Sequence, residues 1–571
     1  MKKSILAFLA VMVLGIAGLL FAQARHPLAP SEDAYITYRY ARNLAEGHGI
    51  VWNVGEDPVE GGTEFLWTVL LAGTNRVTGL SIEDAARVLN LVIGVLAVLV
   101  LALASYTLSG QRFLPALFAT LAFAVGPLSY HIRAGFATPL FTLLMLLITL
   151  MVYLAAYASH QSKARRWSLV LMPLAGLLLG LTRPEGVLFA GMALVAAFIL
   201  LDGHDRRRLA ITTLILLVVP GGIYFLWRWH YFGYFLPNTF YVKNAGEWLH
   251  LRYFPEIYAL FRFMAPLLML IGIGLYRITT RDAIKHLIIL APALIFPWSY
   301  LLIDQLQNLG KRFQYPVYPI FLLAAAMALG ALTLRTPLPP LNRRHLPHYM
   351  AGFLAVGFIL FAPFVVLDRM VLIVVLVAVV AGLKLAEERI EDIDEKKLAV
   401  AGLVVTLALV VFNAQSAFRL ANSFYPTVFD DRKAIGEALK PFAEKGYTIV
   451  ATEAGWIPYF SRWRAIDPFG LNDEYVAHHG LDFDYLDQQH PAIIMYHQVK
   501  NPHPPRWADM VKLLREYAEA RGFELAAVVE RKGPEDLHVY WVDPKNPDAD
   551  ALIKAITDHD EFIYQYKADK R

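Results

Sequence analysis

Long apolar runs recur from Ile5 to about Phe412 of this 571-residue chain and then stop. A run of about 18 or more apolar residues is long enough to cross the hydrocarbon core of a bilayer. Such a segment must be helical in lipid, because water is not available there to satisfy backbone N–H and C=O groups. The composition agrees, since 57% of the residues are hydrophobic and only 18% are charged. The sequence therefore predicts a polytopic α-helical membrane protein.

We predict about thirteen membrane-spanning helices. Every second loop between them is basic, which places the N-terminus in the cytoplasm and the end of the chain outside, in the inner (plasma) membrane. The first apolar run is longer than that of a usual signal peptide, so we expect a retained helix, although Ala22-Gln23-Ala24 is typical of a cleavage site. The predicted spans are 4–22, 84–108, 113–131, 137–158, 168–182, 186–201, 210–230, 255–276, 287–303, 315–333, 349–367, 370–386 and 398–416.

The composition changes after Asn413. We predict a transmembrane module of residues 1–420, with a first outer loop of residues 23–83, and an extracytoplasmic C-terminal α/β domain of residues 421–571. Within the domain, alternating or continuous apolar runs predict strands, and apolar residues at helical spacing predict amphipathic helices. The strand candidates are 447–452, 491–496, 525–529 and 537–542, and the helix candidates are 430–442 and 507–521.

Glu32 and Asp33 are adjacent carboxylates in the first outer loop, just after the first span. They precede a predicted amphipathic helix. One interpretation is helix capping, with Ser31 as the N-cap and the acids in the first turn, where the helix dipole favours them. A second is a general base that takes the proton of an attacking hydroxyl. The pair could instead bind a divalent cation, and Glu60 or Glu64 could join either role.

Several basic residues lie at the predicted outer ends of the spans, where the topology rule disfavours them. Snorkelling and interfacial anchoring explain many such residues one by one. As a set, they predict a site for a phosphate group, held by charge-assisted hydrogen bonds at the depth of a lipid-linked phosphate. The set comprises Arg39, Arg42, Arg133, Arg183, Lys243, Lys311 and Arg312.

The remaining features exclude several other kinds of site. Cysteine is absent, which excludes disulfides and thiolate metal sites. No phosphate loop, nucleophile elbow or zinc-protease pattern occurs. His478 and His479 are adjacent and point in different directions, and His497 and His503 are expected in loops, so the histidines predict solvated surface and no metal site. The net charge of +4 does not indicate nucleic-acid binding.

Three segments of the first outer loop and several later ones form an ordered series. The first-loop segments are Glu32-Asp33-Ala-Tyr-Ile-Thr-Tyr-Arg-Tyr-Ala-Arg-Asn-Leu, Gly47-His-Gly49-Ile-Val-Trp-Asn53-Val-Gly55-Glu56 and Val59-Glu60-Gly61-Gly-Thr63-Glu-Phe-Leu-Trp67. The later ones are Thr182–Gly186, Tyr231–Gly233, Leu236–Thr239 with Lys243, Arg312–Pro316 with Pro319, Ala454–Gly455 with Pro458–Ser461, and Ile466–Asp473. This series resembles the GT-C membrane glycosyltransferases, and most closely the terminal arabinofuranosyltransferases of mycobacteria and their bacterial relatives.

The resemblance implies an inverting glycosyltransferase that moves a sugar from a polyprenyl-phosphate donor to a cell-envelope glycan, lipid or protein outside the cytoplasm. An acid of the first outer loop would be the catalytic base, with Asp33 the first choice and Glu32 the second. We assign the donor phosphate to Arg39, Arg42, Arg183, Lys243 and Arg312, and the acceptor or sugar to Glu60, Asn238 and Tyr38. No cofactor is certain, and a divalent cation remains an open alternative.

Two positions depart from the family pattern. Glu32 stands where an aspartate is common, and Ala137, within Gly135–Pro139, stands where a glutamate is expected. If that acid binds acceptor or metal, its role is missing or relocated here. Two other functions therefore stay open: a lipid or sugar transporter or flippase, and a non-catalytic envelope assembly protein. Most charges lie toward the ends of the spans, whereas a transporter favours charges or broken helices near mid-membrane.

Overall fold

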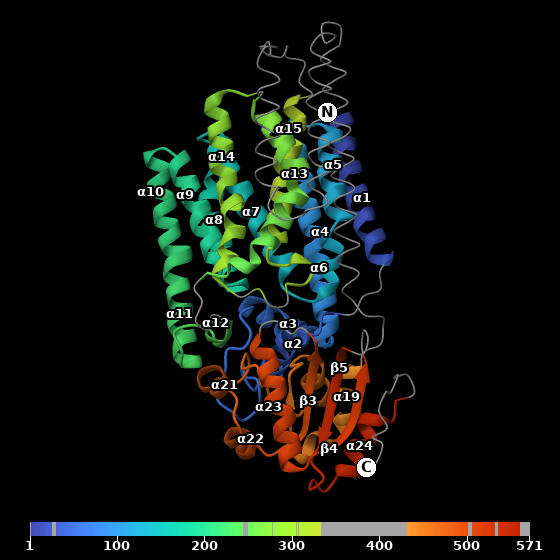
Figure 1. Cartoon of the computed structure of the whole chain (residues 1–571). Coiled ribbons are helices and arrows are strands. Elements are labelled where there is room, and N and C mark those ends of the chain that lie inside the picture. Colours follow the sequence, from blue (N-terminus) through green and yellow to red (C-terminus); the bar gives the residue numbers. More distant parts are fainter. Residues whose placement is uncertain are drawn as a thin grey trace.

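A computed structural model describes residues 2–25, 30–243, 249–276, 278–303, 305, 308–332, 431–500, 505–530 and 535–559. The long helices stand side by side in a bundle, and the C-terminal α/β domain lies at one end of it (Figure 1). Helix α1 (Lys2–Arg25) begins at the opposite end of the bundle. The helices of the first outer loop, α2 (Ala34–Ala45) and α3 (Phe65–Thr78), lie between the bundle and the α/β domain.

The first ten predicted spans all coincide with helices, so the chain is a multi-pass membrane protein. Within the described ranges, nine helices are long and apolar enough to cross a membrane, and α9 is shorter, with 15 residues. The last three predicted spans, 349–367, 370–386 and 398–416, lie outside the described residues. After α1, the spans are built from α4 (Ile82–Leu108), α5 (Phe113–Ala124), α6 (Leu128–Ala134), α7 (Thr138–Tyr157), α8 (Lys163–Thr182), α9 (Gly186–Leu200), α10 (Gly203–Thr213), η1 (Leu214–Val218), α11 (Val219–Phe232), α13 (Phe254–Tyr276), α14 (Thr280–Ile295), η3 (Phe296–Leu302) and α15 (Tyr318–Leu332).

Polar caps set where several of these helices begin. The Ser81 hydroxyl accepts a hydrogen bond from the backbone N–H of Asp84 at 3.1 Å, at the start of α4. Ser162 caps α8 and Thr279 caps α14 in the same way. Each cap satisfies a backbone N–H that has no partner within its own helix. The short polar loops thus fix the starts of the apolar helices.

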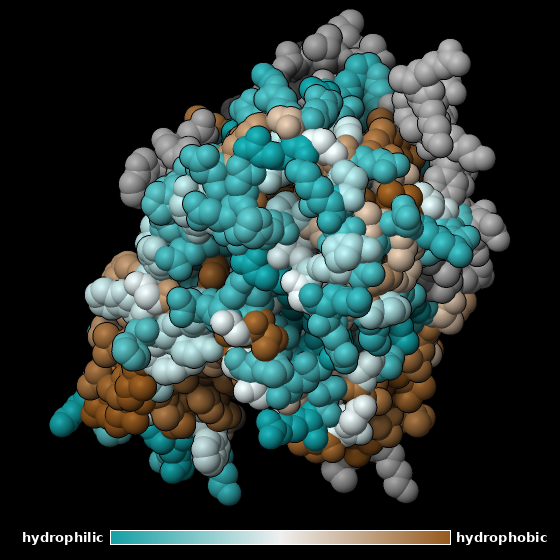
Figure 2. Space-filling model, turned by 90° about the horizontal axis from the view of Figure 1, so that it is seen from below, coloured by the Kyte–Doolittle hydropathy of each residue, from teal (hydrophilic) through white to brown (hydrophobic). Residues whose placement is uncertain are grey.

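The continuous run of α10, η1 and α11 presents the most apolar surface to the outside. Only 6% of the residues in its apolar 18-residue stretch are buried within the protein. Ile215, Ile223 and Leu226 are among its largely exposed side chains. Seen from the end that carries the α/β domain, the molecule is mostly hydrophilic, and hydrophobic surface gathers toward its rim (Figure 2). Contiguous apolar surface of this extent is expected where lipid covers the protein.

The amphipathic helix predicted in the first outer loop is α2. It ends where Gly47 adopts a φ of +91°, a left-handed backbone conformation that glycine reaches without steric cost. The capping interpretation of the acid pair is wrong. Asp33 occupies the N-cap position, but no side chain there accepts a capping hydrogen bond, and Ser31 contributes only its backbone carbonyl, to the N–H of Ala34 at 3.0 Å.

The α/β domain contains a five-stranded mixed sheet in the order β2-β1-β3-β5-β4. Strand β1 (Thr448–Ala451) runs parallel to β2 (Arg464–Ile466) and to β3 (Pro491–Val499). Strand β5 (Asp536–Val542) runs antiparallel to β3 and to β4 (Glu524–Glu530). The helical elements are α19 (Asp431–Leu439), η8 (Lys440–Lys445), α20 (Trp456–Ser461), α21 (Glu474–His479), α22 (Phe483–Gln489), α23 (Pro505–Arg521) and α24 (Ala549–Thr557).

Both faces of this sheet are covered. Ile449 and Ile493 pack on one face with residues of α19, α20 and α24, whereas Val450 and Ile494 pack on the other with residues of α22 and α23. Successive side chains of a strand point to opposite faces, so a strand buried on both faces must be apolar at consecutive positions. This requirement explains why 448–451 and 491–496 are nearly continuous apolar runs.

The four predicted strands and the two predicted helices of the domain are confirmed as β1, β3, β4, β5, α19 and α23. Strand β2 has only three residues, and α20, α21, α22 and α24 have six to nine, so no periodic pattern of useful length marks them. The boundary predicted near residue 420 falls outside the described residues, which resume at Asp431.

Candidate functional site

A cavity of about 480 Å³ lies where the bundle, the first outer loop and the α/β domain meet. Its volume is in the range of about 300–1,000 Å³ that is usual for small-molecule sites. Polar groups from all three parts of the chain line it, together with a few aromatic rings. The charged and aromatic lining residues are Glu32, Asp33, Glu64, Phe136, Arg183, Glu185, Phe240, Lys243, Arg312, Phe313, Glu453, Asp467, Phe469, His497 and Trp507.

The two adjacent acids of the first loop have different surroundings. Glu32 Oε1 accepts hydrogen bonds from the backbone N–H groups of Gly455, at 2.5 Å, and Trp456, at 3.0 Å. A Cβ atom at position 455 would lie 2.0 Å from the Glu32 carbonyl oxygen, so this close approach requires glycine. Glu32 therefore ties the first loop to the α/β domain. Asp33, which also lines the cavity, accepts no comparable backbone hydrogen bonds from the described part of that domain.

Burial and a nearby carboxylate shift the ionisation of both acids. Burial raises the pKa of Asp33, Arg312 opposes that rise, and Glu453 adds to it. Burial, followed by the charge of Glu453, raises the pKa of Glu32 well above its ordinary value. A desolvated carboxylate with a raised pKa is a better proton acceptor than an exposed one. The pKa of Glu32 stays well above its ordinary value although Arg432 opposes the rise, so Asp33, which feels the charges of Arg312 and Lys243, is the acid better placed to ionise and act as a base.

Arg312 is one of the cations that line the cavity. It follows η4 (Leu309–Lys311), and its guanidinium carbon lies 3.8 Å from the centroid of the Phe136 ring. Among the described residues, no ion pair joins Arg312 to a carboxylate, and its buried Nε lacks a hydrogen-bond partner. The charge of Arg312 lowers the pKa of both Asp33 and Glu64. A buried guanidinium with an unused donor is well suited to an anionic oxygen.

Two further cations of the predicted set line the same cavity. Arg183 Nη2 lies 2.6 Å from Glu185 Oε1, and its guanidinium packs over the Phe313 ring at 4.8 Å. Lys243 stands at the end of α12 (Asn238–Lys243), and its charge lowers the pKa of Asp33. Asp33, Arg183, Lys243 and Arg312 are thus brought together from positions spread over some 280 residues of sequence.

The other two predicted phosphate ligands lie outside the cavity lining. Arg42 Nη1 donates to the carbonyl of Tyr459 at 2.6 Å and lies over the Tyr459 ring. Arg39 is only 4% exposed and donates to four oxygens at 2.5–2.9 Å, those of Trp52, Asn53, Pro458 and Trp463. Both arginines therefore join the first loop to the α/β domain.

The three residues expected to bind acceptor or sugar also stand behind the cavity wall. Glu60 forms a buried bidentate pair with Arg228, with N···O distances of 2.6 and 2.9 Å. Asn238 Nδ2 donates to the carbonyls of Gly470 and Leu471. The Tyr38 hydroxyl donates to the carbonyl of Gly135 at 3.3 Å. Each of the three fixes the position of a chain segment, and other residues of these segments line the cavity, such as Asp33, Gly61 and Thr239.

Glu64 lies beside the position at which the family pattern predicts an acid. Its carboxylate oxygen Oε2 accepts a hydrogen bond from the backbone N–H of Ala137 at 3.4 Å. Burial raises the pKa of Glu64, while Arg183 and Arg312 lower it. A carboxylate from the first loop therefore occupies the space next to Ala137, in the field of both cations.

Three polar lining residues of the α/β domain were not singled out from the sequence as site residues: Glu453, Asp467 and His497. Glu453 and Asp467 follow β1 and β2, and His497 lies near the end of the parallel β3. The carboxyl ends of parallel strands are where α/β sheets commonly bind ligands, so the acids after these strands were a usable signal. Burial raises the pKa of Asp467 to about 6.

The expectation that His497 is a solvated loop residue is wrong, because it is part of β3 and contacts Glu453 at 2.7 Å. His478 and His479 are exposed at the end of α21, as expected, and His503 lies outside the described residues.

Comparison with known proteins gives one family match and one curated relative. A family model described as a domain of unknown function (DUF8728) matches residues 422–540. The terminal beta-(1->2)-arabinofuranosyltransferase of Mycobacterium tuberculosis (strain ATCC 25618 / H37Rv) is 29% identical over 272 residues. The alignment covers 44% of this chain and 41% of that protein, so less than half of the relative is matched.

Solved structures match over nearly the whole chain. ArnT from Cupriavidus metallidurans, bound to undecaprenyl phosphate, superposes with a TM-score of 0.55 and 16% identity over 95% of this chain and 98% of that one. The Archaeoglobus fulgidus oligosaccharyltransferase in the apo form gives 0.53 and 13% identity, over 95% and 75%. Identity this low establishes the fold alone. The matches confirm the fold that the resemblance of the first outer loop implies.

Proposed function

This chain has the GT-C membrane glycosyltransferase fold, and we propose that it is an inverting glycosyltransferase that uses a polyprenyl-phosphate sugar as donor. The observation that carries the proposal is the convergence of Asp33, Arg183, Lys243 and Arg312 on one cavity. The curated relative is named as an arabinofuranosyltransferase, and the ArnT structure holds undecaprenyl phosphate. A pentose or hexose carried on such a lipid phosphate fits the charge and size of the cavity. The acceptor would be an envelope glycan, lipid or protein.

In the proposed reaction, the carboxylate of Asp33 takes the proton of an acceptor hydroxyl while the hydroxyl oxygen attacks the anomeric carbon. The bond from that carbon to the phosphate oxygen breaks on the opposite side, so the configuration inverts and polyprenyl phosphate leaves with the bonding electrons. Negative charge grows on the phosphate as it leaves, and Arg312, Arg183 and Lys243 would stabilise it. A general base contributes about 10²–10⁴-fold to such a step.

The cavity would face the extracytoplasmic side. The basic segments Lys163–Arg166, at the start of α8, and Arg206–Arg208, near the start of α10, lie at the end of the bundle away from the α/β domain (Figure 1). The positive-inside rule assigns that end to the cytoplasm. The lipid chain of the donor would then lie against the bundle, with its phosphate at the outer surface. The first outer loop and the α/β domain would keep water from the reacting groups.

We assign to Glu64 the role of the acid that is missing at position 137. Its carboxylate borders the cavity on the side of the bundle, whereas Asp33 lies on the side of α2. This position suits binding of the acceptor hydroxyls rather than the role of the base. The substitution Glu64→Gln keeps the shape and removes the charge. We expect it to raise the acceptor KM while leaving the donor KM nearly unchanged, in initial-rate measurements with each substrate varied. An equal effect on both constants, or on neither, would contradict this role.

The proposed function is tested by mixing purified chain with polyprenyl-phosphate sugars and a fraction of envelope acceptors. We expect a glycosylated product of inverted anomeric configuration, with one polyprenyl phosphate released per sugar transferred. A panel of pentosyl and hexosyl donors identifies the sugar. Uptake of the donor lipid across proteoliposome membranes without any product would instead indicate a flippase.

Replacing Arg312 with glutamine should lower kcat by about 10²–10³-fold, because one charge-assisted donor to the departing phosphate is lost. Arg87→Gln is the matched control, since Arg87 is exposed and its one ion pair within the described ranges is with Asp84 on its own helix. Rates of polyprenyl phosphate release measure the effect. A normal kcat in folded Arg312→Gln protein would remove Arg312 from the proposed site.

A further inference from the structure

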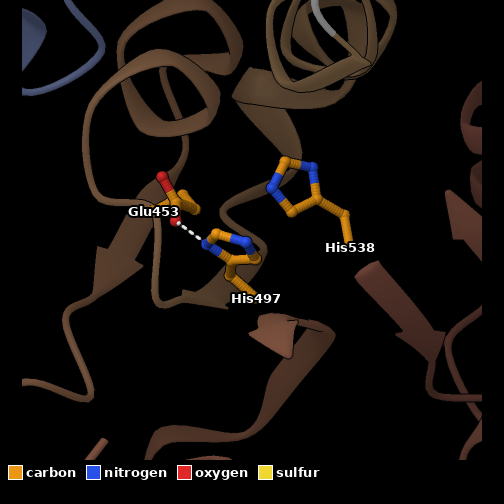
Figure 3. Close-up of side chains that lie close together, drawn as sticks. All are labelled: Glu453, His497 and His538. Atoms are coloured by element: carbon orange, nitrogen blue, oxygen red, sulfur yellow. Dashed lines mark hydrogen bonds and ion pairs between the residues drawn. The ribbon is translucent and has the colours of Figure 1, made fainter. Parts of the chain in front are cut away.

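Glu453, His497 and His538 come together in the α/β domain, next to the cavity (Figure 3). Glu453 follows β1, which pairs with β3, and His497 in β3 lies directly opposite His538 in β5. Residues opposite each other on antiparallel strands point to the same face of the sheet. One carboxylate oxygen and two ring nitrogens lie within 4.8 Å of one another. The sheet register therefore builds the cluster from three distant stretches of sequence.

His538 has an unusual environment. It is completely buried, and its Nδ1 lies 2.6 Å from Asp431 Oδ2. Its Nε2 is also buried and has no hydrogen-bond partner within the described part of the chain. Figure 3 shows a ring nitrogen of His538 directed toward Glu453 and His497. Buried polar atoms are nearly always satisfied, so this nitrogen, which nothing among the described residues satisfies, is available to a bound ion.

The other two members of the cluster are held in a matching way. His497 Nε2 lies 2.7 Å from Asp536 Oδ1, and its Nδ1 lies 2.7 Å from Glu453 Oε1. The second oxygen of Glu453 pairs with Arg432. One ring nitrogen of each histidine thus contacts a carboxylate at the edge of the cluster, that of Asp536 or Asp431. The other ring nitrogen faces the centre of the cluster. Metal-binding histidines are characteristically oriented by carboxylates in this manner.

We propose that Glu453 Oε1, His497 Nδ1 and His538 Nε2 form a site for a divalent transition metal ion of the zinc class. Two imidazoles and one carboxylate are a common zinc ligand set, with metal–ligand bonds of about 2.0–2.2 Å. Shifts of about 1 Å would bring the three atoms to those distances. Asp431 and Asp536 would hold the two rings in the required tautomers. Among the described residues, the carboxylates of Glu453, Asp431 and Asp536 surround the cluster together with the guanidinium of Arg432, and these surroundings favour a cation.

The ion would stand in the wall of the cavity, because Glu453 and His497 line it and His538 lies behind them. Its remaining coordination positions would hold water or an oxygen of a bound molecule. The proposed glycosyl transfer does not require this ion, so the metal site can be tested independently of the proposed function. The rival interpretation is an ion-pair network in which His497 is an imidazolium between Glu453 and Asp536. That network leaves His538 Nε2 without a hydrogen-bond partner among the described residues.

Cobalt binding to the tag-free full chain in detergent tests the site. After chelator treatment, we expect one Co²⁺ per chain, with the visible absorption of a nitrogen- and oxygen-ligated ion, and displacement by Zn²⁺. His538→Ala or His497→Ala should weaken binding at least about 100-fold, since each removes a ligand. Asp536→Asn should weaken it by about 10–100-fold, as loss of an orienting carboxylate does.

His479→Ala is the matched control, because His479 is exposed in the same domain and should leave cobalt affinity unchanged. His497 is less buried than His538, so His497→Ala remains informative if His538→Ala fails to fold. Absence of stoichiometric cobalt binding by the wild-type chain would overturn the proposal in favour of the ion-pair network. Unchanged affinity in folded His497→Ala protein would overturn it as well.

Discussion

Asp33→Asn protein is expected to bind donor normally but to transfer sugar at least about 10³-fold more slowly than the wild type, because the only change is loss of the proton acceptor. Asparagine has nearly the same shape, so the surroundings of α2 should be kept. Single-turnover transfer measures the chemical step, and donor binding is measured separately. Thermal unfolding in detergent establishes that the variant is folded.

Asp57→Asn is the matched control, since Asp57 is an exposed acid of the same loop and should leave the rate unchanged. The pH profile gives an independent check. Burial raises the pKa of Asp33, so kcat/KM should fall as pH drops through a value above the ordinary pKa of about 4 of an aspartate. In the Asp33→Asn protein, this fall of kcat/KM at low pH should vanish. A folded variant with wild-type rate would show that Asp33 is not the base.

Arg39→Ala is expected to destabilise the junction of the first outer loop and the α/β domain by about 3 kcal/mol or more. Four oxygens lose their donor, and an unsatisfied buried acceptor costs about 1–3 kcal/mol. Tyr40 and Trp52 pack in the same core as the sheet, so the loosened loop should also become accessible to protease. Denaturant-induced unfolding followed by tryptophan fluorescence, together with limited proteolysis, measures both effects.

The control for Arg39 is Arg76→Ala, because Arg76 is exposed on α3 and should leave stability near wild type. If Arg39 instead bound the donor phosphate, as its outer position first indicated, Arg39→Ala would weaken donor binding without altering the unfolding transition. The two outcomes separate a supporting role in the fold from a role at the phosphate.

The first ten membrane spans were predictable because lipid imposes a single demand, namely apolar helices long enough to cross it. Strands β1, β3, β4 and β5 were predictable from their apolar runs. The short elements of the α/β domain, such as β2 and α20, carry too few residues for any period to stand out. Their positions depend on contacts with the first outer loop, for example the hydrogen bond from Trp52 Nε1 to the carbonyl of Ala465.

The candidate site was only partly predictable, for a related reason. Four residues of the site lie at the predicted outer ends of elements that all reach the same membrane surface: Asp33, Arg183, Lys243 and Arg312. The topology alone therefore brings them close. Arg39 has the same position and charge, yet two of its four partners are carbonyls more than 400 residues away. Sequence spacing gives no sign of such contacts, which form only when the α/β domain packs on α2.

A structure of the full chain with a polyprenyl-phosphate sugar bound tests most directly whether Asp33 and the cations serve one reaction. The expected arrangement places the phosphate within hydrogen-bond distance of the Arg312 guanidinium, and the Asp33 carboxylate on the opposite side of the anomeric carbon, facing the acceptor space. A phosphate bound outside the cavity, or a sugar whose anomeric carbon is turned away from Asp33, would contradict it.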